Sequence, residues 1–128
     1  MSFGFIFTNL ILKNVIARPR PFFDQNSIYY DYWVQAGSLS EKGYSFPSGH
    51  VTSLAAFAMG LFLAFNKKWS WPFPLIPFLM GYTRIYFSVH YASDIVGGLL
   101  VGFLCGALSL LIFWLLDKYV LKKKEIQI

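Results

Sequence analysis

An uncharged apolar run over residues 95–116 is the feature that most restricts how this chain can fold. As an α-helix the run is about 33 Å long, which is enough to cross the hydrocarbon core of a bilayer. Three other apolar segments cover residues 3–17, 51–65 and 71–89. Charged residues make up only 13% of the sequence, whereas about a quarter is usual in a soluble domain. We therefore expect an all-α, integral membrane helical bundle with about four transmembrane helices in a single domain, residues 1–128.

The segment 18–47 has a different composition, because Pro, Gly, Ser, Asn and acidic residues are mixed there with aromatic ones. Such a mixture suits the membrane interface, where an aromatic ring has one apolar and one wet side. The composition predicts an extracytoplasmic loop with interfacial aromatics. A short amphipathic helix is expected within it, around residues 27–35.

The formal net charge of +5 could indicate a nucleic-acid partner, but the lysines follow apolar segments directly, as membrane-flanking cations do. We expect no nucleic-acid partner. If every segment crosses the bilayer, the lysines at 67–68 and 118–124 share one side, and the positive-inside tendency places that side in the cytoplasm. The arginines on the other side count against this orientation, although arginines that hold a bound anion need not follow a loop-charge rule.

Three short polar clusters interrupt the apolar background and supply what phosphate-ester hydrolysis needs. Cations hold phosphoryl oxygens, one imidazole attacks while another protonates the leaving group, and a carboxylate orients the attacker. In the proposed topology all three clusters meet at the outer face of the membrane. They are Lys13 with Arg20-Pro21, then Pro47-Ser48-Gly49-His50, then Arg84 with His90 and Asp94.

The second cluster opens an apolar segment, so Ser48 is a plausible N-cap and the simplest interpretation is a helix start. A helix N-terminus with a glycine is also an anion cradle, because its free backbone N–H groups and its dipole point toward bound phosphate. His50, in the first turn, would then lie within reach of the anion.

In the third cluster, His90 and Asp94 share one face if the last helix starts near His90, and the carboxylate can then fix the imidazole tautomer. Arg84 would come from the end of the preceding helix. A His–Asp pair is often only a structural hydrogen bond. Two His and one Asp could also bind zinc or iron, but three nearby cations would repel a divalent metal, so no metal is expected.

Three glycines at intervals of four residues, Gly98, Gly102 and Gly106, continue the line of Asp94 along the last apolar segment. Small residues on one stripe let helix backbones approach closely in lipid. The stripe predicts a helix-packing surface.

These clusters resemble the three motifs of the type 2 phosphatidic acid phosphatase superfamily, which also contains the vanadium haloperoxidases. The first motif, Lys-x6-Arg-Pro, is matched by KNVIARPRP at 13–21, and the second is PSGH at 47–50. The third, Ser-Arg-x5-His-x3-Asp, is matched by TRIYFSVHYASD at 83–94, where Thr83 replaces the usual serine and keeps a hydroxyl.

The resemblance implies catalysis without a metal or cofactor. It implies that His90 is the nucleophile that forms a phosphohistidine, that Asp94 orients it, and that His50 is the general acid. It also implies a phosphate pocket made of Lys13, Arg20, Ser48, Gly49 and Arg84.

The expected function is hydrolysis of a lipid phosphate or diphosphate at the outer face of the cell membrane, with undecaprenyl diphosphate slightly favoured among the substrates. Alternatives are a lipid phosphotransferase and a noncatalytic fragment that binds lipid phosphates. Membrane members of the family generally have six helices with the first motif after the third. The chain is therefore expected to lack amino-terminal helices, as a fragment, a misassigned start, or a short form that forms a homo-oligomer among membrane lipids.

Overall fold

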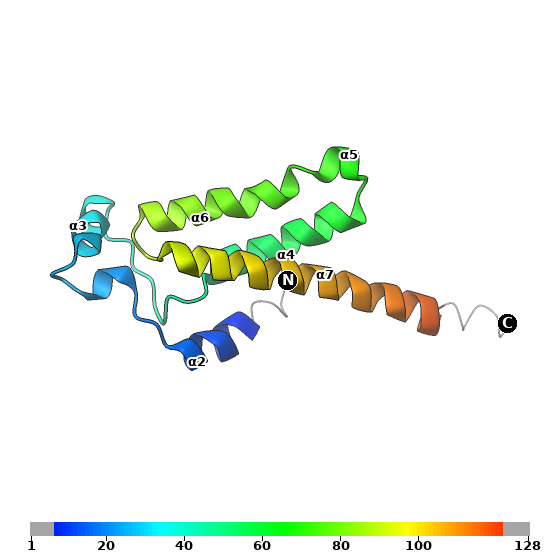
Figure 1. Cartoon of the computed structure of the whole chain (residues 1–128), viewed down its shortest axis with the longest axis horizontal. Helices are drawn as coiled ribbons and strands as arrows, with labels where there is room; N and C mark the ends of the chain where they lie inside the picture. Colours follow the sequence, from blue (N-terminus) through cyan, green and yellow to red (C-terminus); the bar gives the residue numbers. More distant parts are fainter. Residues whose placement is uncertain (1–6, 122–128) are drawn as a thin grey trace.

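The fold is a set of helices, and the computed structural model describes it for residues 7–121 (Figure 1). No strand occurs in that part of the chain, so the prediction of an all-α fold is confirmed there. In chain order the elements are a π-helical turn Phe7–Leu12, α2 (Lys13–Ile16), a 3-10 turn Pro21–Phe23, α3 (Ile28–Gln35), α4 (Gly49–Ala64), α5 (Lys67–Ser70), a 3-10 turn Phe73–Leu75, α6 (Ile76–Tyr86), α7 (Ala92–Leu116) and a π-helical turn Asp117–Leu121.

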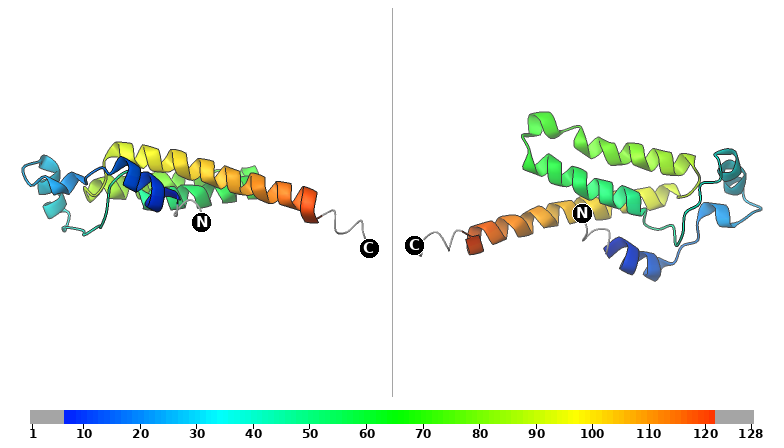
Figure 2. Two further views of the ribbon diagram at one scale, coloured as in Figure 1. Left: turned by 90° about the horizontal axis from the view of Figure 1, so that it is seen from below. Right: turned by 180° about the vertical axis from the view of Figure 1, so that it is seen from behind.

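The three longest helices pack together and bring their motif-bearing ends to one end of the molecule. Helix α7 lies along α4, and α6 contacts both of them. Because α6 runs opposite to α4 and α7, its carboxyl end meets their amino ends (Figures 1 and 2). The segment 18–47, which includes α3 and is coloured blue to cyan, lies beyond this same end (Figure 1).

Close contact between α4 and α7 depends on the predicted glycine stripe. Gly98, Gly102 and Gly106 are buried and face α4. A Cβ atom added at Gly102 would meet the Ala55 Cβ at 2.6 Å and would clash with the Thr52 carbonyl oxygen. The stripe therefore packs helices, as its spacing predicts.

The predicted helix at 71–89 is wrong in its extent, because α6 covers only Ile76–Tyr86. Pro72 and Pro74 precede it in turns, and proline cannot continue a hydrogen-bonded helix. After Tyr86 the chain turns through Ser88, whose φ of 50° is left-handed. The turn ends the helix and leads the chain to His90.

Helix α7 with its continuation, Ala92–Tyr119, is the one helix among the described residues that is long and apolar enough to cross a membrane. Helix α4 has only 16 residues and α6 only 11. A perpendicular span needs about 20. The short helix expected around residues 27–35 is observed as α3 (Ile28–Gln35). Residues 3–6 of the first apolar segment and the lysines 122–124 lie outside the described residues.

Replacing Gly102 by Ala should destabilise the protein by about 1–3 kcal/mol, because the methyl group overpacks the contact with α4. Thermal melting in detergent would measure this as a lower midpoint. The matched control is Gly60→Ala on α4, where an added Cβ meets nothing within 4 Å and alanine favours the helix. Equal midpoints for the two variants would contradict the close-packing role of Gly102.

Candidate active site

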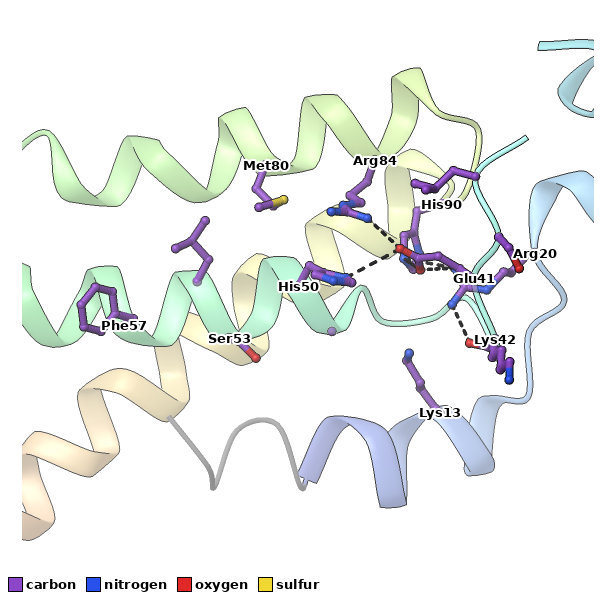
Figure 3. A pocket seen from close by; sticks show the side chains of 14 residues that line it. Lys13, Arg20, Glu41, Lys42, His50, Ser53, Phe57, Met80, Arg84 and His90 are labelled. Carbon is purple, nitrogen blue, oxygen red and sulfur yellow. Dashed lines mark hydrogen bonds and ion pairs between the residues drawn. The ribbon is translucent and has the colours of Figure 1, made fainter. Parts of the chain in front are cut away.

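The predicted site residues come from four separate parts of the chain that meet at one end of the bundle (Figure 3). Arg20 follows α2, and His50 lies in the first turn of α4. Arg84 is in the last turn of α6, and His90 lies two residues before α7 begins. All four side chains line one cavity.

Backbone hydrogen bonds hold these chain ends together. The Ser48 N–H donates to the Asp94 carbonyl at 3.1 Å, which joins the start of α4 to the start of α7. The Arg20 guanidinium donates to the Val89 carbonyl at 3.0 Å, and to the Gly43 carbonyl at 2.9 Å. Arg20 is therefore both a buried cation and a structural link between the loop and the segment before α7.

The carboxylate of Glu41 lies at the centre of the cluster. Its Oε2 is 2.8 Å from Arg20 Nη1 and 3.6 Å from His90 Nε2. Its Oε1 is 2.7 Å from Arg84 Nη1 and 3.8 Å from His50 Nδ1. One anion thus contacts basic side chains from all three sequence motifs, as the dashed lines in Figure 3 indicate.

The surroundings of Glu41 strongly favour its charged form. Hydrogen bonding from the His90 imidazole, followed by the charge of Arg20, lowers the pKa of Glu41 from 4.5 to about 2, although burial opposes this. An opposite charge within a few ångströms stabilises a carboxylate in this way. Glu41 is therefore an anion at every pH at which the protein would work.

His90 is buried between Asp94 and Glu41, and this arrangement distinguishes its two ring nitrogens. Nδ1 is 3.5 Å from Asp94 Oδ2, while Nε2 faces Glu41 and lies 3.4 Å from Arg20 Nη1. Nε2 can donate to Glu41 only when it carries a proton. With the proton on Nδ1 instead, next to Asp94, the Nε2 lone pair faces the position that the Glu41 carboxylate now occupies.

His90 and Asp94 lie side by side, as the sequence predicts, but they do not share one face of a helix. His90 precedes α7, and Asp94 lies in its first turn. The Tyr91 N–H donates to Asp94 Oδ2 at 2.8 Å, so Asp94 also caps the helix. A carboxylate is favourable at a helix N-terminus, where the free N–H groups carry partial positive charge.

His50 occupies the open side of the cluster. Its side chain is 54% exposed, whereas that of His90 is 1% exposed. The two imidazoles approach different oxygens of the Glu41 carboxylate, His50 near Oε1 and His90 near Oε2. A displacement at a central phosphorus atom needs such a pair, with the attacking and leaving groups on different sides.

The remaining predicted residues lie close by, with different degrees of contact. Lys13 and Gly49 line the cavity, and the Lys13 side chain extends from α2 toward the cluster (Figure 3). Ser48 is buried beside the cavity, where its Oγ has no hydrogen-bond partner among the described residues. It is the N-cap of α4 by position, but its hydroxyl makes no cap hydrogen bond.

Two further donors in the cluster are also unpaired in the described part of the chain: Arg84 Nε and His90 Nδ1. A buried polar atom without a partner typically costs about 1–3 kcal/mol. An oxyanion with several oxygens has more acceptor positions than the single carboxylate of Glu41. The arrangement is chemically suited to holding a phosphoryl group.

The cavity has a volume of about 830 Å³ and extends from this polar end along α4 and α6. Its far part is lined by Leu54, Phe57 and Met80 (Figure 3). A charged end and an apolar continuation match the two parts of a lipid phosphate.

Reasoning from the sequence missed two charged residues of this site, Glu41 and Arg18. Arg18 Nη1 donates to Asp94 Oδ1 at 2.9 Å. Neither residue has a periodic position that would reveal it. Glu41 could have been sought on electrostatic grounds, because cations clustered at one end of a bundle require a nearby anion.

Comparison with known proteins finds a matching family model and several similar curated proteins. The sequence model of the PAP2 superfamily matches residues 1–118. The chain is 35% identical over 95 residues to an undecaprenyl-diphosphatase of Sulfolobus acidocaldarius, covering 72% of the chain and 42% of that protein. It is 32% identical over 95 residues to a lipid A 4'-phosphatase of Bacteroides thetaiotaomicron, covering 73% and 42%.

A third relative is the undecaprenyl-diphosphatase BcrC of Bacillus subtilis, 34% identical over 100 residues, with 78% of the chain and 48% of the relative covered. The chain thus spans about half the length of the curated relatives it matches. No solved structure matches it.

Replacing Glu41 by Gln should strengthen the binding of vanadate about tenfold, because the oxyanion no longer has to displace a carboxylate. Isothermal titration in detergent would measure this affinity. Asp31→Asn, at an exposed acidic position of α3, is the matched control and should leave it unchanged. Weaker vanadate binding by Glu41→Gln would mean that Glu41 helps to hold the oxyanion.

The same variant should melt at a lower temperature than the wild type in anion-free buffer, because the cations lose their counter-charge. The pKa of Glu41 is about 2 in the folded protein, below its ordinary value of 4.5. Its contribution is therefore fully present above pH 4.5 and is lost as the pH falls toward 2. A constant difference in melting midpoint from pH 7 to pH 2.5 would contradict this.

Proposed function

Because the chain belongs to the PAP2 superfamily, we propose that it hydrolyses a lipid phosphate or diphosphate through a phosphohistidine on His90. The observation that carries the proposal is the Glu41 carboxylate, which is held by basic side chains from all three motifs. A cage that binds one anion so closely can bind the phosphoryl group of a substrate in the same position.

In the first step, His90 Nε2 attacks phosphorus, a P–N bond forms, and the P–O bond to the lipid breaks. Asp94 orients the ring and stabilises the positive charge that develops on it. His50 donates a proton to the departing oxygen. Arg20, Arg84 and Lys13, with the start of α4 at Ser48 and Gly49, hold the phosphoryl oxygens.

In the second step, water attacks the phosphohistidine, His50 accepts a proton from this water, and His90 is released. The exposure of the His50 side chain gives water a direct approach to the phosphoryl group. If a lipid or sugar hydroxyl replaced water, the same site would be a phosphotransferase. Product analysis with a radiolabelled lipid phosphate separates the two, because only hydrolysis releases inorganic phosphate.

Glu41 must leave the cage before a substrate can enter, since two anions cannot share the same cations. The Glu41 side chain turns out of the cage, and Arg20 and Arg84 then present their donors to the phosphoryl group. The unliganded site is therefore closed by the protein's own carboxylate.

Undecaprenyl diphosphate is the substrate we favour. Two of the relatives are named as undecaprenyl-diphosphatases, and the apolar part of the cavity suits an isoprenoid chain. A lipid A phosphate is the second candidate, because another relative is named a lipid A 4'-phosphatase.

We place the protein in the cell membrane as a multi-pass bundle with the site and the 18–47 loop on the extracytoplasmic side. The apolar helix Ala92–Tyr119 and the exposed apolar side chains of α4 and α6 support this topology. With α4 and α6 too short for a perpendicular span, the polar end would lie within the headgroup region. Oligomerisation would cover part of the exposed apolar surface.

Replacing His90 by Ala should lower turnover by about a thousandfold or more, because the attacking atom is removed. Phosphate release from undecaprenyl diphosphate in detergent micelles measures it, with Lys68→Gln at the other end of α4 as the control. His50→Asn should show a milder loss when the leaving group is p-nitrophenolate, which needs little protonation. Near wild-type turnover by His90→Ala would overturn the mechanism. Vesicle binding without turnover by the wild type would indicate a noncatalytic binding protein.

Cysteine labelling tests the orientation, after Cys105 is replaced by Ser. A cysteine at Ser40, in the loop, should react with a membrane-impermeant maleimide in intact cells. A cysteine at Lys68 should be protected until the cells are opened. The reverse pattern would place the site in the cytoplasm.

A further inference from the structure

Arg18 contacts the first turn of α7 at three points, although it lies outside the cavity lining. Its Nη1 donates to Asp94 Oδ1 at 2.9 Å and to Ser93 Oγ at 2.6 Å. Its guanidinium carbon lies 4.0 Å from the centroid of the Tyr91 ring, in cation–π geometry. These contacts fix both the position of the guanidinium and its planar orientation.

The backbone of Arg18 is anchored as well. Its carbonyl accepts a hydrogen bond from the Ser45 N–H at 2.9 Å, and the neighbouring Pro19 carbonyl accepts one from Ser45 Oγ. The Arg18 side chain is 35% exposed, whereas that of Asp94 is fully buried. Arg18 is therefore held between the loop and α7 and reaches the buried carboxylate from the solvent side.

Asp94 is positioned by this contact. Oδ1 is taken by Arg18 and Oδ2 by the Tyr91 N–H, so the carboxylate cannot rotate about its own axis without breaking one of two short hydrogen bonds. In this orientation Oδ2 is also the oxygen nearest to His90 Nδ1, at 3.5 Å. Rotation of Asp94 would take Oδ2 away from His90 Nδ1.

We propose that Arg18 is a positioning residue for the nucleophile: it holds Asp94 so that Asp94 holds His90. This inference rests on the function proposed above. Arg18 touches no reacting atom, and it acts only through the carboxylate.

Other charged groups also face His90, and they belong to every element packed around it. All of them are unchanged in a variant at position 18, so a difference between variants reports Arg18 alone. They are Lys13 on α2, Arg20, Glu41 in the loop, His50 on α4, Arg84 on α6 and Asp94 on α7.

The test compares Arg18→Gln, Arg18→Lys and the charge control Lys68→Gln with the wild type, using p-nitrophenyl phosphate in detergent and measuring kcat and KM. This leaving group needs little help from a general acid, so kcat reports the nucleophile. We expect Arg18→Gln to lower kcat about tenfold with little change in KM, because Asp94 then no longer holds the His90 ring while the residues that hold the phosphate are unchanged.

Arg18→Lys should lower kcat severalfold, less than Arg18→Gln does, with little change in KM, because an ammonium keeps the charge but loses the planar contact with the Tyr91 ring that orients the guanidinium. A rise in KM with an unchanged kcat in Arg18→Gln would mean that Arg18 affects substrate binding only, and it would overturn the proposal. If Arg18→Gln does not fold, Arg18→Lys decides alone, and a wild-type kcat in that variant overturns it. Wild-type protein without turnover would instead refute the proposed function, and the inference with it.

Discussion

The crowding of positive charge at one end of the bundle is the constraint on which the rest of the structure depends. Arg20, Arg84 and two imidazoles surround the largely buried Glu41 carboxylate, and like charges this close together repel one another. The fold can bring the three motifs together only if an anion balances them. Glu41 supplies that anion from within the chain, so under the proposed function the folded unliganded state and the substrate complex would use the same cage.

This double use explains why the loop 36–48 is bound so firmly to the site. Arg20 donates to the Gly43 and Lys42 carbonyls of the loop while its Nη1 contacts Glu41. When the Glu41 carboxylate leaves, the hydrogen bonds from Arg20 to the loop backbone can stay. Only the ion pair between Arg20 and Glu41 is then replaced, by a contact with the incoming anion. The free energy needed to open the cage is therefore set by one ion cluster rather than by unfolding of the whole loop.

The parts of this site that could be predicted from the sequence are those fixed by local spacing. Arg84 ends one helix and Asp94 begins the next, so their meeting at one end follows from antiparallel packing. Glu41 and Arg18 make their decisive contacts with residues 43 and 76 positions away, and no local pattern encodes them. The helix expected at 71–89 was too long because hydropathy alone ignores what proline does to a backbone.

The polar and the apolar parts of the cavity would recognise different parts of a lipid phosphate. Under the proposed function the polar end would contact only the phosphoryl group, which all lipid phosphates share, so it would not distinguish one lipid tail from another. Charge could separate a diphosphate from a monophosphate there, since the more highly charged group competes better with Glu41. Any choice among lipid tails must then come from the apolar part between α4 and α6, around Leu54, Phe57 and Met80. Apolar contacts discriminate between substrates by only about 1–3 kcal/mol per methylene. Under the proposed function, selectivity for a phosphate group is therefore high and selectivity among lipid tails is low.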